Sequence, residues 1–188
     1  MRAGEALISI VVLRNRTLVW AIPHRGAPAF AAVPLDATAI KATVEKLRKA
    51  LEPNIRLVGD IPAFDVRAAH ELYRGLLEPV AAGWQEAQSL LIVPHGPLAQ
   101  LPFTLLVTKP TVLPAERGAL FSNYRDVPWL VRERAVTVLP SVGALVTLRR
   151  LPGGDPSRRH FVGFGDPYFS VEQAEQARDQ ELLKVAAL

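Results

Sequence analysis

Residues 90–103 have the sequence Leu90-Leu91-Ile92-Val93-Pro94-His95-Gly96-Pro97-Leu98-Ala99-Gln100-Leu101-Pro102-Phe103. The first four residues form an apolar run of strand length, too short to settle as a helix. Two prolines and a glycine follow around His95 and end the strand in a turn. A second apolar patch comes next, so we expect a short helix that folds back over the strand end. This order is typical of the start of a crossover unit in an open α/β sheet.

The chain beyond this stretch alternates between strand and helix patterns. Apolar runs predict further strands at Ala135–Leu139 and Phe161–Phe164, and Ser141 is expected to cap the helix after the first of them. Val171–Leu188 has a weaker helical pattern. Near-continuous apolar strands are typical of a sheet buried on both faces. We therefore predict an α/β fold with a mixed, mainly parallel sheet flanked by helices, in which Leu90–Val93 is the central strand.

The first third of the chain is rich in strand patterns. Ala6–Leu13 and Thr17–Ile22 predict an N-terminal β-hairpin through Arg14-Asn15-Arg16, because Asn tolerates the left-handed turn conformation. Ala29–Val33 is predicted to add a third short strand. Asp36 is then expected to cap a first helix, whose apolar face is formed by Ile40, Val44, Leu47 and Leu51.

A second helix is predicted after residue 65. Phe64 and Asp65 give it a hydrophobic residue followed by an N-cap, and Pro79 ends it or tightens it. Two connections, residues 107–128 and 152–159, are long or rich in proline and glycine and have few apolar anchors. We predict that these two loops are the most mobile parts of the chain.

Composition excludes several classes of protein. A length of 188 residues with 49% apolar residues suits one ordinary domain with a sizeable core. The absence of cysteine excludes a disulfide scaffold, a Cys-ligated zinc site and a thiol nucleophile within this chain. No apolar run approaches the roughly 18–20 residues of a membrane span, and Arg14 and Arg16 follow the first apolar run where a secretory signal would have small residues. We expect a cytoplasmic protein that does not contact the membrane.

The excess of basic over acidic residues in the chain is small. Its net charge of +4 comes from 22 basic against 18 acidic residues. The densest cluster, Arg149-Arg150 followed by Arg158-Arg159-His160, has no interleaved aromatic residue on which bases could stack. We interpret it as a solvated helix end and loop, and expect no nucleic-acid partner.

Several short motifs resemble catalytic or ligand-binding signatures but lack a necessary part. His95 lies in a turn after a strand, with no Ser, Cys or carboxylate nearby in sequence, so we interpret it as a surface turn residue. His70-Glu71 begins like a zinc-binding His-Glu-x-x-His helix, but Arg74 occupies the second His position. His24 and His160 have no spaced partner. No metal site is predicted.

Two further motifs have structural interpretations. Gly163-Phe164-Gly165-Asp166-Pro167-Tyr168 resembles the start of a dinucleotide fingerprint, but the third glycine is missing and Pro167 removes an amide that could face a phosphate. Ser141 directly follows a proline at a helix start and is better explained as a cap than as a nucleophile. We predict no cofactor.

Taken in order, the landmarks along the chain resemble one family. The Val93-Pro94-His95-Gly96 turn that runs on to Leu101-Pro102-Phe103 is similar to a turn of CHAT domains. These are caspase-like modules, related to the separase-like cysteine peptidases and often found behind helical repeats. The other similar landmarks are Gly4-Glu5-Ala6-Leu7, Pro34-Leu35-Asp36, Leu72-Tyr73 with Leu76-Leu77-Glu78-Pro79, Val138-Leu139-Pro140-Ser141 with Leu145, and Gly163-Phe164-Gly165-Asp166-Pro167.

The resemblance also implies what this chain lacks. Family members that cut proteins carry a His-Gly after a later strand and a Cys after the strand beyond it, both downstream of the Gly-Asp-Pro landmark. The resemblance therefore implies that residues 1–188 are the amino-terminal part of a CHAT domain, with a hairpin and first helix in 1–64 and an α/β core in 65–188. The His/Cys dyad is expected beyond Leu188, and no catalytic residue is assigned in this chain.

Two functions remain open from the sequence. In the first, the chain is the non-catalytic front half of a cysteine peptidase domain, supporting its sheet and substrate groove and contacting a helical-repeat region of the same parent protein. In the second, it is a stand-alone α/β interaction module without peptidase activity. The expected partner is a protein or a peptide substrate in both cases.

Overall fold

The computed structural model describes residues 1–52, 60–116, 118–151, 172–173 and 175–176. The chain divides into two compact units, Met1–Arg150 and Leu151–Leu188. In the second unit the described residues are Leu151 and four exposed helical residues of the predicted last helix. The predicted strand Phe161–Phe164, the loop 152–159, His160 and the glycines of residues 163–168 lie outside the described residues.

The first unit is built on a five-stranded mixed sheet with the strand order β3-β2-β1-β4-β5. The strands are β1 (Glu5–Val12), β2 (Thr17–Pro23), β3 (Ala29–Val33), β4 (Ser89–Val93) and β5 (Ala135–Val138). The first three form an antiparallel meander, which confirms the hairpin and the third strand. β4 pairs in parallel with β1 and with β5.

One expectation about this sheet needs correction. The middle strand of the described sheet is β1 instead of the strand at residues 90–93. The described sheet is mixed and partly parallel, and because the predicted parallel strand at residues 161–164 lies outside the described residues, a mainly parallel sheet stays a prediction. β1 takes the middle position because both of its edges are paired. Its hairpin partner β2 covers one edge, and the distant strand β4 covers the other. Local sequence patterns predict the hairpin, but they carry no information on which distant strand occupies the second edge.

The helices begin where the predicted caps lie. α1 (Ala37–Leu51) begins after Asp36, whose carboxylate accepts the Ala39 amide at 2.8 Å. α2 (Val66–Leu76) begins after Asp65, whose carboxylate accepts the Ala68 amide at 2.8 Å. Both caps are therefore confirmed. α2 gives way to the 3₁₀ helix η2 (Glu78–Gly83), which has Pro79 in its first turn.

The remaining helices are short. η3 (Gly96–Gln100) and η4 (Phe103–Leu105) form the predicted fold-back after β4, as 3₁₀ turns. η5 (Ser122–Tyr124) lies within the long connection, and α3 (Leu130–Glu133) precedes β5. α4 (Val142–Arg150) follows β5, with the Ser141 hydroxyl accepting the Ala144 amide at 3.1 Å, so this predicted cap is confirmed as well.

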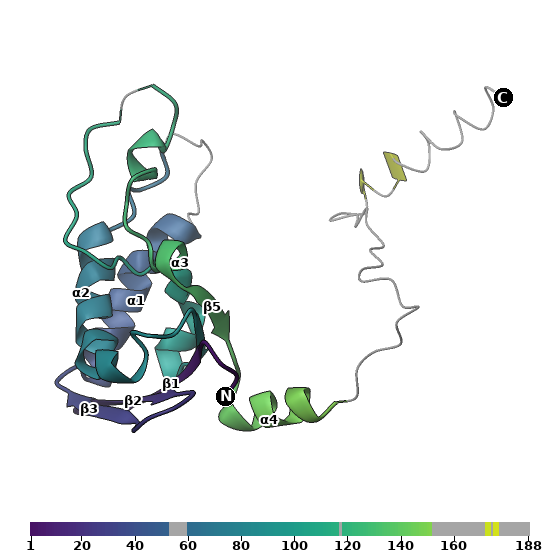
Figure 1. The fold of residues 1–188 in the computed structure, drawn as a ribbon. Helices are drawn as coiled ribbons and strands as arrows, with labels where there is room; N and C mark the ends of the chain where they lie inside the picture. Colours follow the sequence, from purple (N-terminus) through teal and green to yellow (C-terminus); the bar gives the residue numbers. More distant parts are fainter. Residues whose placement is uncertain (53–59, 117, 152–171, 174, 177–188) are drawn as a thin grey trace. The chain divides into compact units, whose positions relative to one another are not determined.

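The main core lies between the sheet and the helices. In Figure 1, α1 and α2 stand side by side above β1, β2 and β3. Ile8 and Ile10 of β1 are fully buried with Ile40 and Leu47 of α1 and Leu76 of α2. A smaller cluster lies on the other face of the sheet, where Leu7, Leu91 and Leu139 are packed by partly buried residues that include Leu145 of α4.

Burial on both faces is confirmed for one predicted strand among the described residues. Leu90, Leu91 and Ile92 of β4 are all buried. In β5, Ala135, Thr137 and Val138 are exposed, and Val138 keeps 48% of its surface accessible. β5 is the outermost strand on its side in the described sheet, so it lacks a second neighbour that would cover it there.

The connection at residues 107–128 is closed at its base. Val107 bridges Trp129, and the Thr108 amide donates to Pro128 O at 2.9 Å. Val107 and Val127 are buried at this base. The mobility of the segment between them stays a prediction.

Candidate functional site

The carboxyl ends of β1, β4 and β5 point to one edge of the sheet, because these strands are parallel. Ligands of open α/β sheets usually bind outside the carboxyl ends of the strands. We call this rim the carboxyl edge; its last strand residues are Val12, Val93 and Val138. His95 and Ser141 follow two of these ends within three residues and are therefore the candidate side chains of the rim.

His95 connects two of the strand ends. Its Nδ1 accepts the Val12 backbone amide at 3.2 Å, so the imidazole of the β4 turn is bonded to the end of β1. A ring nitrogen that accepts an amide must carry a lone pair, which places the proton of the neutral ring on Nε2. His95 is thus a turn residue, as expected, but one with a defined partner. Sequence reasoning missed this bond because Val12 lies in a distant strand.

Ser141 is not arranged as a nucleophile. Its hydroxyl oxygen is occupied by the cap of α4, where it accepts the Ala144 amide. Among the described residues, no hydrogen bond joins it to a histidine. The chemistry that the carboxyl edge can offer from described side chains is therefore hydrogen bonding by one imidazole.

The other histidines that the sequence singled out are held by backbone carbonyls. His70 donates from Nδ1 to Val107 O at 2.9 Å, and its ring stacks on Tyr73. His24 donates from Nδ1 to Met1 O at 2.7 Å. In the part of the chain that the structure describes, no group of three or more His, Cys, Asp or Glu side chains could hold a metal ion.

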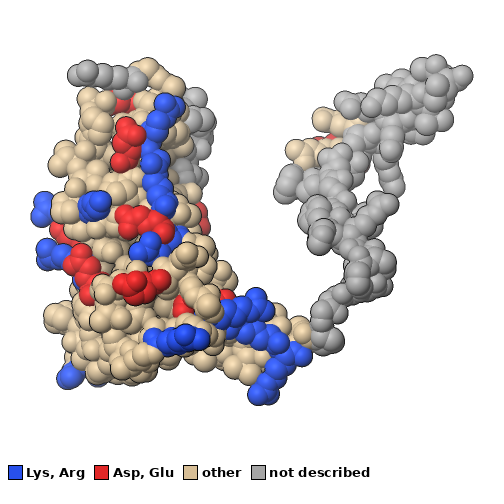
Figure 2. Space-filling view, in the orientation of Figure 1, with Lys and Arg blue, Asp and Glu red and all other residues tan. Residues whose placement is uncertain are grey.

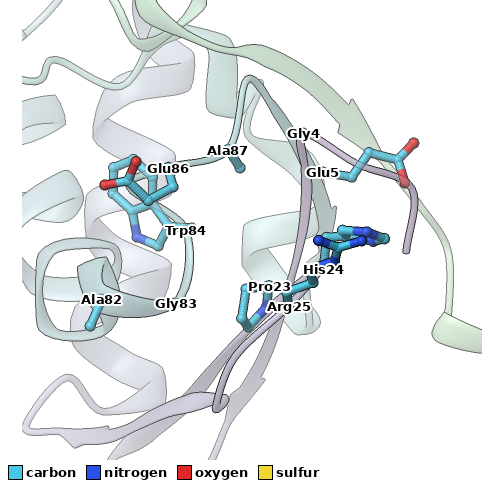
Figure 3. A pocket seen from close by; sticks show the side chains of 10 residues that line it. All are labelled: Gly4, Glu5, Pro23, His24, Arg25, Ala82, Gly83, Trp84, Glu86 and Ala87. Atoms are coloured by element: carbon cyan, nitrogen blue, oxygen red, sulfur yellow. The ribbon is translucent and has the colours of Figure 1, made fainter.

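A cavity of about 220 Å³ lies at the opposite, amino edge of the sheet (Figure 3). The cavity is lined by Gly4 and Glu5 at the start of β1 and by Pro23, His24 and Arg25 where β2 ends. The other lining residues follow η2 or belong to it: Ala82, Gly83, Trp84, Glu86 and Ala87. The Glu5 carboxylate points away from Trp84 and Glu86 in Figure 3 and pairs with Arg149 at 2.5 Å. The Trp84 indole is also occupied, since it donates to Leu77 O at 2.8 Å. Sequence reasoning missed this cavity because three separate segments build it.

A larger cavity of about 800 Å³ lies between α2 and residues 110–113. Two of its acidic side chains already have basic partners, because Glu71 pairs with Arg67 and Asp65 pairs with Lys46. The hydrogen bonds from Lys46 and from the Ala68 amide lower the pKa of Asp65 below its usual value. Burial raises the pKa of Tyr73, which lies behind the His70 ring. The cavity has no cluster of polar groups that defines a reaction.

Comparison with known families decides the classification. The CHAT domain family matches residues 66–187. The chain belongs to the CHAT domain family. No curated protein matches the chain, and no solved structure does.

The CHAT match begins at the first residue of α2. It covers the landmarks on α2 and η2, the turn that contains His95, and the Leu139-Pro140-Ser141 segment that leads into α4. The two landmarks near the amino terminus, Gly4–Leu7 and Pro34–Asp36, lie before the matched residues. β1 is nevertheless part of the CHAT sheet in this protein, because it pairs with β4 along five residues.

The surface of this CHAT domain has no single dominant charge on the face drawn in Figure 2. Basic and acidic side chains are intermixed over most of it, and a basic group lies over α4, whose last turn carries Arg149 and Arg150. No helix among the described residues is long and apolar enough to cross a membrane.

Proposed function

We propose that this chain is the non-catalytic front half of a CHAT caspase-like cysteine peptidase domain. The observation that carries the proposal is a family match over residues 66–187 in a chain without cysteine. A cysteine peptidase needs a thiolate that attacks the peptide carbonyl and a base that activates it. The chain cannot supply that thiol, so its role in such an enzyme is to support the groups that do the chemistry.

The carboxyl edge is the part of the fold that suits this supporting role. The ends of β1 and β4 are fixed relative to each other by the His95 imidazole, and Leu139 donates to Ile92 O at 2.8 Å just beyond β5. β5 has one edge that no described strand covers. In our proposal the remaining strands of the domain, with the His and the Cys, are added beyond it, and the peptide substrate binds across the resulting rim.

A second candidate is a stand-alone interaction module without peptidase activity. It is favoured by apolar side chains that remain exposed on α4, where Val142, Val146 and Leu148 keep 42%, 44% and 58% of their surface accessible. Contiguous exposed apolar residues mark surfaces that bind other proteins. A protein partner is part of both proposals.

The test compares residues 1–188 with the product of the complete gene, each incubated with a diverse peptide library. We expect no cleavage by residues 1–188 alone. Cleavage by the complete product that is lost when its cysteine is replaced supports the peptidase proposal. Cleavage by residues 1–188 that is lost in His95→Ala overturns it, and no cleavage by either sample favours the interaction module.

A further inference from the structure

The outward face of β1, β2 and β3, turned away from α1 and α2, is apolar except for Glu5 and Ser9 of β1, and Ser9 is opposite Trp20. Side chains alternate along a strand, and the buried set of β2 is Thr17, Val19 and Ala21. Its other set is Leu18, Trp20 and Ile22. Trp20 is opposite Phe30 of β3, and Leu18 is opposite Ala32. An antiparallel sheet with one face in water normally has polar side chains there, so this composition needs an explanation.

Part of this outward face has no cover among the described residues of the first unit. The cluster around α4 includes Leu7, Leu91 and Ile22 but does not extend to the other end of the hairpin. We call the remaining residues the hairpin patch: the exposed Phe30 and Ala32 and the half-buried Val11, Leu18 and Trp20. Phe30 keeps 54% of its surface accessible although its ring lies 5.0 Å from that of Trp20. The patch thus has an aromatic pair at its centre.

The charged side chains of the hairpin segment itself have one sign. Residues 6–35 include no Asp or Glu, and their three charged side chains are Arg14, Arg16 and Arg25. The first two are exposed in the β1–β2 turn, next to Val11 and Leu18 of the patch, whereas Arg25 lies beyond Ile22 at the amino-edge cavity. The acidic residues that flank this segment already have partners, since Glu5 pairs with Arg149 and Asp36 caps α1.

We propose that the hairpin patch binds an amphipathic helix of a partner protein, with apolar residues along one face and acidic residues at the end that reaches Arg14 and Arg16 in the β1–β2 turn. Three adjacent strands span about 10 Å, which is the diameter of one helix. This interface goes beyond the proposed function, because it lies on the hairpin and uses neither the carboxyl edge nor a thiol.

A second copy of the chain fits the patch less well. In a two-fold interface each patch meets an identical patch, so its arginines face arginines or apolar residues. Within residues 6–35 there is no carboxylate to compensate them. A partner with its own acidic residues pairs these charges, and such complementarity determines which partner binds.

The probe is a fluorescein-labelled helical peptide of about 16 residues with leucines along one face and glutamates at one end. One control peptide has lysines in place of the glutamates, and another has glutamines in place of the leucines. Binding to the full chain is followed by fluorescence anisotropy. We expect the glutamate peptide to bind at least about tenfold more tightly than either control, with the advantage over the lysine peptide reduced at high salt.

Variants of the full chain locate the interface. Phe30→Asp and Ala32→Asp, two exposed positions of the patch, should each weaken binding about tenfold or more, and circular dichroism checks that each variant is folded. Arg14→Glu with Arg16→Glu should reverse the preference toward the lysine peptide. Val112→Asp, at a residue with 92% of its surface accessible, and Arg74→Glu with Lys109→Glu are the matched controls and should change nothing.

Three results overturn the proposal. One is equal binding of the glutamate and lysine peptides, or no saturable binding of the first. Another is binding that survives Ala32→Asp in a folded variant. The third is a dimer in sedimentation analysis that Phe30→Asp or Ala32→Asp dissociates, which would assign the patch to a second copy.

Discussion

Gly83 is the residue that the packing of η2 constrains most closely. A Cβ atom at this position would lie 2.5 Å from Ala21 O and 2.8 Å from Ala21 Cβ. Both atoms belong to β2 in the core, where the backbone cannot move aside without disturbing the strand pairing. We predict that Gly83→Ala lowers the free energy of unfolding by about 1–3 kcal/mol, as overpacking of a core does.

Urea denaturation of wild type and variant measures this change. Gly143→Ala is the matched control, because the nearest atom to a Cβ there is Ser141 Oγ at 3.7 Å. Gly143 lies in α4, so alanine should leave stability unchanged or raise it by up to about 1 kcal/mol through helix propensity. Equal effects of the two substitutions would contradict the close contact of η2 with β2.

Asp65 links stability to pH. The Lys46 ammonium and the Ala68 amide hold its pKa in the folded state below the value of about 3.9 found in unfolded chains. The unfolded state therefore binds more protons in this range, and the stabilisation is complete above the unfolded pKa and lost as pH falls through the folded pKa. We predict that Asp65→Asn, which can still cap α2, costs stability near neutral pH and that the cost disappears as the solution becomes acidic.

Thermal unfolding of both proteins between about pH 6 and pH 2 tests this sign. Lys46→Met provides the control, because it removes the cation but retains the carboxylate cap. In the Lys46→Met background, Asp65→Asn should cost less stability at neutral pH than it does in the wild type. A cost of Asp65→Asn that grows on acidification would be inconsistent with the lowered pKa.

At the scale of elements, α4 is attached by one ion pair and one side chain. Arg149 pairs with Glu5 at the start of β1, and Leu145 is packed against the cluster of Leu7, Leu91 and Leu139. Both charged side chains are at least three-quarters buried. We predict that Arg149→Ala increases amide hydrogen exchange across Val142–Arg150 and leaves β1 and β4 protected, because the helix can open without the sheet.

The adjacent residue is the control for this prediction. Arg150 is exposed and has no ion pair among the described residues. Arg150→Ala therefore removes an arginine side chain from α4 without breaking the ion pair between Arg149 and Glu5. A double-mutant cycle with Glu5→Gln should give a coupling energy of about 0.5–1 kcal/mol for Arg149. A coupling of zero would show that the pair does not hold α4.

The elements differ in how far the sequence predicts them. Asp36, Asp65 and Ser141 are predicted as caps because a cap depends on a side chain and the amides three residues away. α3 is not predicted, since its four residues are fewer than a periodic pattern needs. The exposure of β5 is not predicted either, because an apolar run does not reveal whether a strand has one neighbour or two.

At the scale of the whole molecule, the first unit has its own core. Residues 1–150 include all five described strands, the main cluster between sheet and helices, and the smaller cluster under α4. We predict that this fragment, produced alone, folds and melts in a single cooperative transition when followed by circular dichroism. A broad transition with no defined midpoint would indicate that its core is incomplete.

The strand order and the candidate site could not be predicted from the sequence, because both depend on contacts between distant segments. The family is predicted from short landmarks that each lie within one turn or helix. The pairing of β1 with β4, the His95–Val12 bond and the cavity at the amino edge all join segments far apart in the chain. The periodicity of apolar residues within one segment does not indicate which distant segment that segment will contact.

The neighbour relation of β1 and β4 has a consequence during synthesis. Val12 leaves the ribosome roughly eighty residues before Val93, and translation at about 5–20 residues per second separates them by about 4–16 s. For that interval β1 is an edge strand of the meander, because its second partner β4 has not yet been synthesised. Unpaired strand edges can pair with other chains, so the open edge of β1 makes the nascent chain prone to aggregation until β4 emerges and joins it.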